Sequence, residues 1–247
     1  MINFVIPMAG MGSRFSDKGY KLPKPLIDVL GKPMIQRVVE NLNTSYEHRF
    51  IFICQNRHIN DFKLLELFQK IAPGYEAIGI DGYTEGAACT VLKAKELINN
   101  DDQLIIANSD QWINANMNDF INDWYIKDSH GHIMTMKSSD SKWSYVKFDN
   151  HKKVLSVVEK VVVSDEATVG IYCFKTGRDY IKHCEKMIEE NNRSKGEFYV
   201  APVYDYLIKN GNNISLFNIG DDEGGMYGLG TPDDLGIFIN SFKDKDF

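Results

Sequence analysis

Short apolar runs alternate with segments of helical periodicity along the first half of the chain. An unbroken apolar run predicts a strand covered on both faces, and apolar residues at every third or fourth position predict a helix. The predicted strands are 3–7, 50–54, 75–80 and 104–107, and the predicted helices start at Pro33 and span 64–71 and 85–97. This alternation predicts a mainly parallel sheet with helices on both faces.

The pattern changes after about residue 130, where strand-like segments follow one another closely. They predict a small antiparallel extension of the main sheet and lie at 132–137, 143–148, 154–158 and 168–174. Three helices are expected near 177–190, over about 198–210 and after Thr231-Pro232, where Thr231 can cap and Pro232 fits the first turn. We therefore expect one α/β domain over 1–247, a three-layer sandwich around a mixed sheet.

The charge and hydropathy of the chain argue against two classes of partner. With 247 residues, 43% of them hydrophobic, the chain can form one sizeable core. The formal net charge of −6 argues against a general nucleic-acid-binding protein, so a site for an anion needs a local positive field. The sequence has no apolar run of membrane-spanning length and no basic segment typical of a signal peptide. We expect a cytoplasmic protein that contacts neither nucleic acid nor membrane.

The cysteines and histidines do not suggest a metal centre. Four widely spaced cysteines lie in apolar segments, which predicts buried free thiols. They are Cys54, Cys89, Cys173 and Cys184. His130 and His132 lack nearby ligand partners in the sequence, so we interpret 129–132 as a solvated turn that leads into a strand.

A glycine-rich loop directly follows the first predicted strand. Gly10 and Gly12 allow a sharp turn that brings backbone N–H groups close to an anion. Arg14 adds a forked positive charge, and Lys24 adds a compact one ten residues later. This combination suits a nucleoside triphosphate that is about to lose pyrophosphate.

Two common phosphate motifs do not fit this loop. A dinucleotide-binding turn requires a third glycine at position 15, where the chain has Phe15, and the Gly-Lys-Ser/Thr of a P-loop is absent. The stretch 9–15, followed by Pro23-Lys24-Pro25-Leu26 and by Gly31-Lys32-Pro33-Met34, instead resembles the sugar-phosphate nucleotidylyltransferase family. The resemblance continues to the later blocks of the chain. It implies a Rossmann-like sheet of the GT-A type, with a nucleotide-binding part over about 1–130 and an acceptor-binding part over about 131–247.

The resemblance also implies a mechanism in which a phosphate of the acceptor attacks the α-phosphorus and pyrophosphate leaves. Arg14 would neutralise the leaving pyrophosphate, and Lys24 would stabilise the charge at the α-phosphoryl group. Asp110, at the end of a buried strand, matches the family's Mg²⁺ ligand, and Lys160 matches the lysine that grips the acceptor phosphate. The partners are then a nucleoside triphosphate and a small phosphorylated acceptor. The resemblance leaves the oligomeric state open and allows a homodimer.

The same resemblance assigns two further sets of residues to binding. The nucleotide-binding set contains Met8, Ala9, Gly10, Met11, Gly12, Ser13, Gln55, Glu85, Gly86 and Ala87. The acceptor-binding set contains Ser144, Tyr145, Glu159, Gly170 and Glu197. Gln55 and the start of the helix at Gly86 correspond to the positions where the family recognises the base, and Gly86 would let the base approach the backbone.

The chain departs from the family pattern at two positions. Many relatives have a second metal-binding aspartate where this chain has Gly228, so the second ligand is lost or is supplied from 221–223. Sugar-handling relatives often have glycine where this chain has Ser144, which indicates an altered acceptor pocket. In both features the chain resembles a branch of the family that is found in capsule-biosynthesis loci. One known activity close to that branch is the transfer of a cytidylyl group from CTP to phosphoglutamine.

We therefore expect a Mg²⁺-dependent nucleotidylyltransferase that makes an activated precursor for capsule or another surface polysaccharide, with CTP favoured. The acceptor is a sugar 1-phosphate or a non-sugar such as phosphoglutamine. A glycosyltransferase of the GT-A type is one alternative, although it would normally show an Asp-x-Asp motif where the chain reads Asn108-Ser109-Asp110. A non-catalytic nucleotide sensor is the other, and it would not need to retain Arg14, Lys24 and Asp110.

Overall fold

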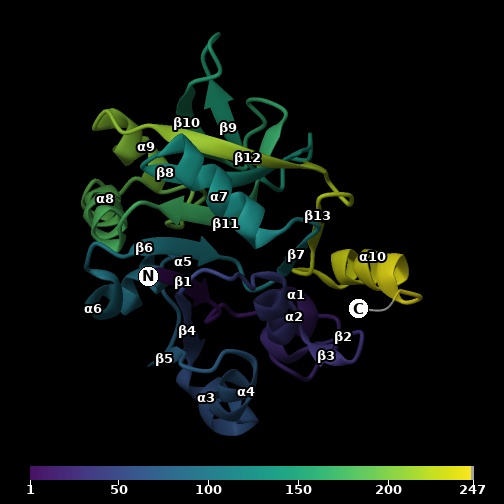
Figure 1. The fold of residues 1–247 in the computed structure, drawn as a ribbon. Coiled ribbons are helices and arrows are strands. Elements are labelled where there is room, and N and C mark those ends of the chain that lie inside the picture. Colours follow the sequence, from purple (N-terminus) through teal and green to yellow (C-terminus); the bar gives the residue numbers. More distant parts are fainter. Residues whose placement is uncertain (246–247) are drawn as a thin grey trace.

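One nine-stranded mixed sheet forms the centre of the molecule (Figure 1). The structure is a computed structural model, and it describes residues 1–245. The strands follow the order β10, β9, β11, β6, β1, β4, β5, with β8 paired to β11 and β12 paired to β8. They are β1 (Ile2–Pro7), β4 (His48–Gln55), β5 (Glu76–Ile80), β6 (Gln103–Ala107), β8 (Gly131–Lys137), β9 (Ser144–Phe148), β10 (Val154–Glu159), β11 (Glu166–Phe174) and β12 (Ile214–Asp221).

The apolar runs of the first half form the parallel part of this sheet, as predicted. β1 pairs in parallel with both β4 and β6, and β4 pairs in parallel with β5. Side chains of β1 alternate between two cores, because successive residues of a strand point to opposite faces. Phe4 and Ile6 join one core, and Val5 joins the other. Both faces of the strand are therefore covered, which explains its unbroken apolar sequence.

Helices cover both faces of the sheet, which confirms the three-layer α/β arrangement. The first core packs against α2 (Met34–Asn41), α4 (Leu64–Ile71) and α7 (Met117–Lys127). The second core packs against α5 (Ala87–Val91), α8 (Gly177–Glu189) and α9 (Val203–Lys209). The remaining helical segments are α1 (Ser13–Ser16), η1 (Lys24–Leu26), α3 (Asn56–Phe62), η2 (Leu92–Ala94), α6 (Lys95–Ile98) and α10 (Pro232–Phe242).

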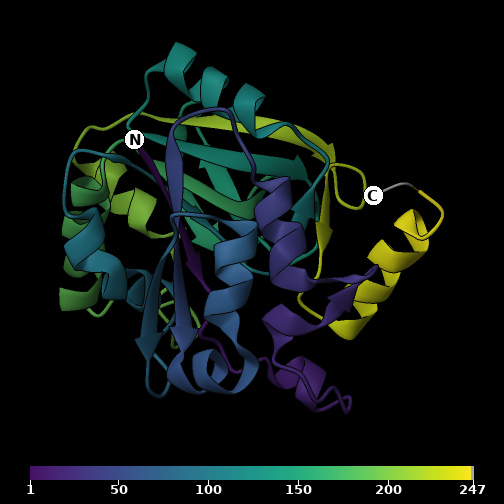
Figure 2. The same ribbon diagram turned by 60° about the horizontal axis from the view of Figure 1, so that its bottom comes forward.

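A third, smaller core attaches α10 to the segments that follow the glycine loop. Leu235 and Phe238 of α10 pack with Phe15 of α1 and Met34 of α2. Figure 2 shows α10 in yellow at the side of the sheet, beside the purple N-terminal segments. As predicted, Thr231 caps this helix, and its side chain accepts a hydrogen bond from the backbone N–H of Asp234. Two short antiparallel pairs complete this side, β2 (Asp28–Val29) with β3 (Lys32–Pro33) and β7 (Gln111–Ile113) with β13 (Met226–Gly228).

The antiparallel extension is present, with differences in detail. β9, β10 and β11 pair in antiparallel fashion, but β12, which was not predicted, adds a parallel strand beside β8. The helix expected over 85–97 is three short segments, and the helix expected from 198 begins only at Val203. The residues just before it, 198–201, instead pack into the core and against the cleft described below. The structure also contains α7, whose apolar positions repeat with helical spacing but which was not predicted.

The cysteine prediction is confirmed for three of the four side chains. Cys54, Cys173 and Cys184 are buried free thiols, and Cys89 is a free thiol that is only partly buried. Burial raises the pKa of the Cys54 and Cys184 thiols to about 12, so both are protonated at neutral pH. Within the described residues, no helix combines the length and the apolar character needed to cross a membrane.

The interpretation of 129–132 as a solvated turn is wrong for His132. This histidine lies in β8 and is fully buried beside Phe120, with Nδ1 2.6 Å from Ser215 Oγ and Nε2 3.3 Å from Asp123 Oδ2. Burial lowers the pKa of His132 to about 4 and outweighs the opposing effect of Asp123. The turn prediction failed because β8 already includes Gly131 and His132, and Ser129 before it is buried as well.

Stability is expected to fall as the pH drops from about 6.5 to about 4. In this interval the unfolded chain binds a proton at His132 that the folded chain excludes, so the free energy of unfolding decreases, by up to about 3 kcal/mol from this group. Urea unfolding of the wild type and of His132→Gln at pH 7 and pH 4.5 measures the effect. The exposed His151→Gln is the matched control. An equal pH dependence in all three proteins would contradict this assignment.

Candidate active site

Two adjoining cavities open at the edge of the sheet where β1, β6 and their loops end. The first, of about 380 Å³, is lined by the glycine loop, by Glu197 and Gly230, and by a segment that contributes Tyr83, Thr84, Gly86, Ala87 and Thr90. The second, of about 290 Å³, is lined by the residues after β6, by the start of β9, by the middle of β11 and by 199–201. Pro7, Lys24, Ala87 and Asp110 line both. The position fits the rule that open α/β sheets bind ligands at the carboxyl ends of their parallel strands.

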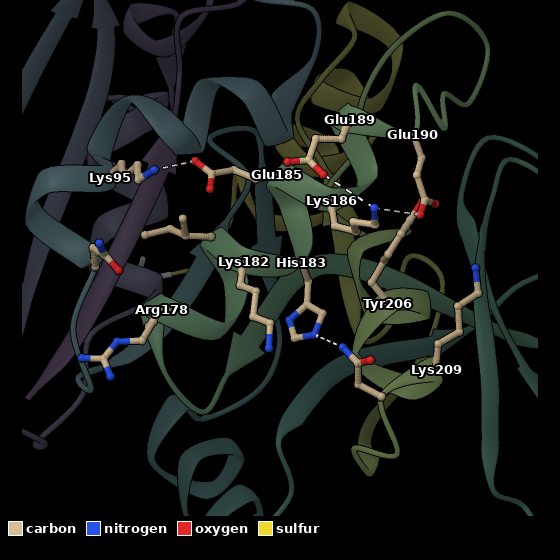
Figure 3. Close-up of a pocket in the computed structure, with 13 residues that line it drawn as sticks. Lys95, Arg178, Lys182, His183, Glu185, Lys186, Glu189, Glu190, Tyr206 and Lys209 are labelled. Carbon is tan, nitrogen blue, oxygen red and sulfur yellow. Dashed lines mark hydrogen bonds and ion pairs between the residues drawn. The ribbon is translucent and has the colours of Figure 1, made fainter.

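A larger cavity of about 680 Å³ lies elsewhere, between α6, α8 and α9 (Figure 3). It contains none of the residues predicted from the sequence. Many of its charged and polar side chains already have partners within the protein. Lys95 pairs with Glu185, and His183 contacts Asn210. Lys186 lies near Glu189 and Glu190. We therefore locate the candidate active site in the two smaller cavities.

The glycine loop adopts the conformation that its sequence requires. Gly12 has a φ of 65°, a left-handed conformation, and it directly precedes α1. A Cβ at this position would lie 3.3 Å from Cβ of Lys24, so the glycine also lets Lys24 approach the loop. Most of the predicted loop residues line the first cavity, namely Gly10, Met11, Gly12, Ser13 and Arg14. Met8 and Ala9 are buried behind it.

Lys24 and Asp110 form an ion pair at the junction of the two cavities. Lys24 Nζ lies 2.7 Å from Asp110 Oδ2, although 86 residues separate them in the chain. Their side chains are only 22% and 26% exposed, so the pair is partly shielded from water. The structure thus brings together the two residues to which the family resemblance assigns charge stabilisation and metal binding.

The loop that ends at Gly86 is held against Phe198. Gly86 has a φ of 131°, and a Cβ at this position would lie 2.7 Å from the backbone nitrogen of Phe198. The backbone of Phe198 donates to Glu85 O at 2.8 Å and accepts from Ala88 N–H at 3.0 Å. Only glycine fits this close contact, and the contact fixes the edge of the first cavity.

Two residues predicted to contact the nucleotide, Gln55 and Glu85, are engaged with other parts of the protein. The Gln55 amide nitrogen donates to Ala9 O at 2.7 Å and to Gly82 O, so it ties the glycine loop to the loop before Gly86. Glu85 is exposed and pairs with Arg193. A direct contact of Gln55 or Glu85 with a base stays a prediction, whereas Gly86 and Ala87 line the cavity.

The second cavity contains a buried polar network. Ser144 Oγ donates to the Glu159 carboxylate, and Thr168 Oγ1 lies 2.9 Å from Tyr172 Oη. Burial raises the pKa of Glu159, and the hydrogen bond from Ser144 opposes that effect. All four side chains line the cavity. A protonatable carboxyl and three hydroxyls can recognise donors and acceptors on a polar acceptor molecule.

The other predicted acceptor residues divide between the cavities and the core. Gly170 has a φ of 81° and lines the second cavity, with Asn108 and Gln111 occupying the space that a side chain would take. Glu197 lines the first cavity instead of the second. Tyr145 is fully buried, and its hydroxyl donates to Asp140 O, because it follows Ser144 on a strand and points to the opposite face.

Sequence reasoning missed several residues of the second cavity. Lys142 and Trp143 line it directly before Ser144, and Tyr199 lines it after Glu197. The ammonium of Lys142 lies over the Trp143 ring at 4.7 Å and 3.5 Å from Asp234. Their positions next to predicted residues were a usable signal, but their contacts depend on strands and loops far apart in the chain.

Asp110 offers a single carboxylate at the place where substrate phosphates would bind, which is an arrangement that suits Mg²⁺. Among residues 1–245 no cluster of three or more histidine, cysteine or acidic side chains can hold a metal ion. Mg²⁺ is commonly held by one or two carboxylates together with substrate phosphates, and the Asp110 carboxylate faces both cavities. A Cβ at Gly230 would lie 2.7 Å from Asp110 Oδ2, so the glycine keeps this carboxylate accessible.

Gly228 occupies the position at which many relatives have a second metal-binding aspartate. Gly228 pairs with Gln111 in the small β7–β13 sheet, and a Cβ there would lie 3.6 Å from Asp234 Oδ2. Asp222 accepts hydrogen bonds from Trp143 Nε1 at 3.1 Å and from Ser138 Oγ at 3.3 Å. Its carboxylate is therefore already engaged by Trp143, which lines the second cavity, and Asp222 itself lines neither of the two cavities.

Comparison with known proteins identifies the family. Residues 4–220 match the family described as nucleotidyl transferase, so the chain belongs to this family. It is 27% identical over 224 residues to the bifunctional protein GlmU of Desulfotalea psychrophila, covering 86% of this chain and 62% of that protein. It is 22% identical to GlmU of Thermodesulfovibrio yellowstonii, covering 99% of this chain and 53% of that protein. The chain thus spans just over half the length of these relatives.

Solved structures confirm the fold. The nucleoside-diphosphate-sugar pyrophosphorylase of Vibrio cholerae has a TM-score of 0.82 and 25% identity, covering 96% of this chain and 99% of that one. A UDP-glucose pyrophosphorylase complexed with UDP-glucose has a TM-score of 0.77 and 16% identity over the full length of both chains. At 16% identity, the second likeness concerns the fold alone.

Proposed function

We propose that this protein is a nucleotidylyltransferase that joins a nucleoside triphosphate to a small phosphorylated acceptor and releases pyrophosphate. The observation that carries the proposal is the Lys24–Asp110 pair at the junction of two cavities. A reaction between two bound substrates requires such a junction, where the attacking phosphate meets the α-phosphorus. Membership in the nucleotidyl transferase family supports the same class of reaction.

Residues at the junction and around it have separate roles in this reaction; Lys160 lines neither cavity itself, but its ammonium contacts Tyr199, which lines the second. The backbone N–H groups of 10–13 and the Arg14 guanidinium bind and neutralise the phosphates of the leaving group. Lys24 stabilises the negative charge that develops at the α-phosphoryl group, and Lys160 orients the acceptor phosphate. A Mg²⁺ ion on Asp110, when bound, would neutralise phosphate charge at the same junction.

We propose CTP as the preferred nucleotide and phosphoglutamine or a sugar 1-phosphate as the acceptor. This preference rests on the likeness of the chain to a capsule-biosynthesis branch of the family, with Ser144 and Gly228 as its features in this sequence. The Ser144 hydroxyl donates a hydrogen bond to the Glu159 carboxylate, so a substrate group in the second cavity meets a preorganised Ser–Glu pair. A glycine at position 144 would instead expose the backbone to the substrate. The product would be an activated precursor for a surface polysaccharide, made in the cytoplasm.

We further propose that 1–130 provides most of the nucleotide site and 131–247 most of the acceptor site. Glu197 and Gly230 are exceptions, since they line the first cavity from the second part of the chain. The last two residues, 246–247, lie outside the described residues.

Pyrophosphate release tests the proposed function. Purified protein is mixed with each nucleoside triphosphate and a panel of phosphorylated acceptors in the presence of Mg²⁺. We expect acceptor-dependent release of pyrophosphate, highest with CTP. Release of a nucleoside diphosphate from a sugar donor would instead favour a glycosyltransferase, and nucleotide binding with no turnover would favour a sensor.

A further inference from the structure

Lys160 is held in place by contacts on three sides. Its backbone has a φ of 56°, in the left-handed region, and its N–H donates to Trp143 O at 3.1 Å. Its Nζ donates to Tyr199 Oη at 2.9 Å and lies 4.8 Å from the centre of the Tyr199 ring. The Glu159 carboxylate is farther away, with Oε1 3.9 Å from Nζ.

Tyr199 belongs to a short segment that touches both cavities. Glu197 lines the first cavity, the backbone of Phe198 is bonded on both sides of Gly86, and Tyr199 lines the second cavity. The Phe198 ring is buried, and the guanidinium of Arg193 lies over it at 4.1 Å. Three consecutive residues therefore connect the edge of the first cavity to the ammonium group of Lys160.

We propose that Tyr199 is the positioning residue for Lys160, so that the binding site for the acceptor phosphate is fixed relative to the nucleotide loop. This inference rests on the proposed function, in which Lys160 binds that phosphate. A lysine ammonium has three N–H donors, and the bond to Tyr199 uses one of them. The other two are left to bind phosphate oxygens. Without the tyrosine hydroxyl, the flexible lysine chain would be drawn to the buried carboxylate of Glu159 and would bind the acceptor less well.

The Tyr199→Phe variant tests the proposal because it removes the hydroxyl and keeps the ring. We expect the KM for the acceptor to rise about tenfold, with kcat and the KM for the nucleotide within about twofold of the wild type. Tyr206→Phe is the matched control, since the Tyr206 hydroxyl bonds Glu190 and Asn192 and lines neither of the two cavities. An unchanged acceptor KM in Tyr199→Phe, or an equal rise in the KM of both substrates, would overturn the proposal.

A second measurement does not depend on turnover. Limited acetylation with acetic anhydride, followed by mass spectrometry, reports the reactivity of each lysine. We expect Lys160 to react several times more slowly in Tyr199→Phe than in the wild type, because its ammonium would then pair with the buried Glu159 carboxylate and be less available to the reagent. Lys160 in Tyr206→Phe reacts at the wild-type rate. If the wild type lacks pyrophosphate release with every substrate pair, the proposed function fails, and this labelling still decides whether Tyr199 restrains Lys160. Equal labelling in all three proteins would refute the restraint.

Discussion

The Lys24→Ala variant is expected to lose about 10²–10³-fold in kcat for pyrophosphate release. Lys24 lies at the junction of the two cavities, where negative charge develops during the displacement, and the charge it provides acts in a partly shielded site. The fold should survive, because Asp110 is 26% exposed and water can solvate its carboxylate when the lysine is removed. Circular dichroism and thermal unfolding check that the variant is folded.

Lys32→Ala is the matched control for this experiment. Lys32 also forms an ion pair, with Glu40 at 2.8 Å, but it lines neither cavity. We expect it to retain wild-type turnover to within about twofold, because exposed ion pairs contribute little to stability. Near-normal turnover in Lys24→Ala, with the true substrates, would rule out the proposed role of this lysine.

The Asp110→Asn variant is expected to lose about 10²–10³-fold in turnover and to bind divalent cations less tightly. Asparagine preserves the shape of the side chain but removes the negative charge that pairs with Lys24 and would hold Mg²⁺. Electron paramagnetic resonance of Mn²⁺, titrated with a non-hydrolysable nucleotide present, measures the cation affinity directly. We expect that affinity to fall at least about tenfold.

Asp128→Asn provides the control for this substitution. Asp128 pairs with Lys175 at 2.8 Å on the surface, and it lines neither cavity. It should leave both turnover and Mn²⁺ affinity unchanged. If Asp110→Asn retains wild-type Mn²⁺ affinity, Asp110 is not the metal ligand, even if the rate falls.

The sequence predicted those features of the fold and the site that depend on residues close together in the chain. The loop around Gly12 could be recognised because the left-handed turn, the N–H groups and Arg14 are close together in the chain. Asp110 was selected by the family resemblance, and its position fitted because a buried strand ends there and the carboxyl ends of parallel strands meet at one edge of a sheet. The alternation of strands and helices similarly predicted the three layers.

Features that depend on distant packing could not be predicted. The contact of Tyr199 with Lys160 joins residues 39 positions apart, and the clamp of Phe198 on Gly86 joins two loops across the cleft. The helix expected over 198–210 lost its first turn to these contacts. Ser144 and Tyr145 could not both face the acceptor, because neighbouring residues of a strand point to opposite faces, and the structure buries Tyr145.

The central claim is that two substrates react across the Lys24–Asp110 junction, and the stoichiometry of a single reaction tests it most directly. Wild-type protein is incubated with CTP, Mg²⁺ and either phosphoglutamine or a sugar 1-phosphate, and both products are quantified by mass spectrometry. The proposed function predicts one pyrophosphate for each nucleotide–acceptor conjugate, and neither product when the acceptor is omitted. Failure to form a conjugate with any nucleotide and acceptor tested, or formation of nucleoside diphosphate in place of pyrophosphate, would contradict it.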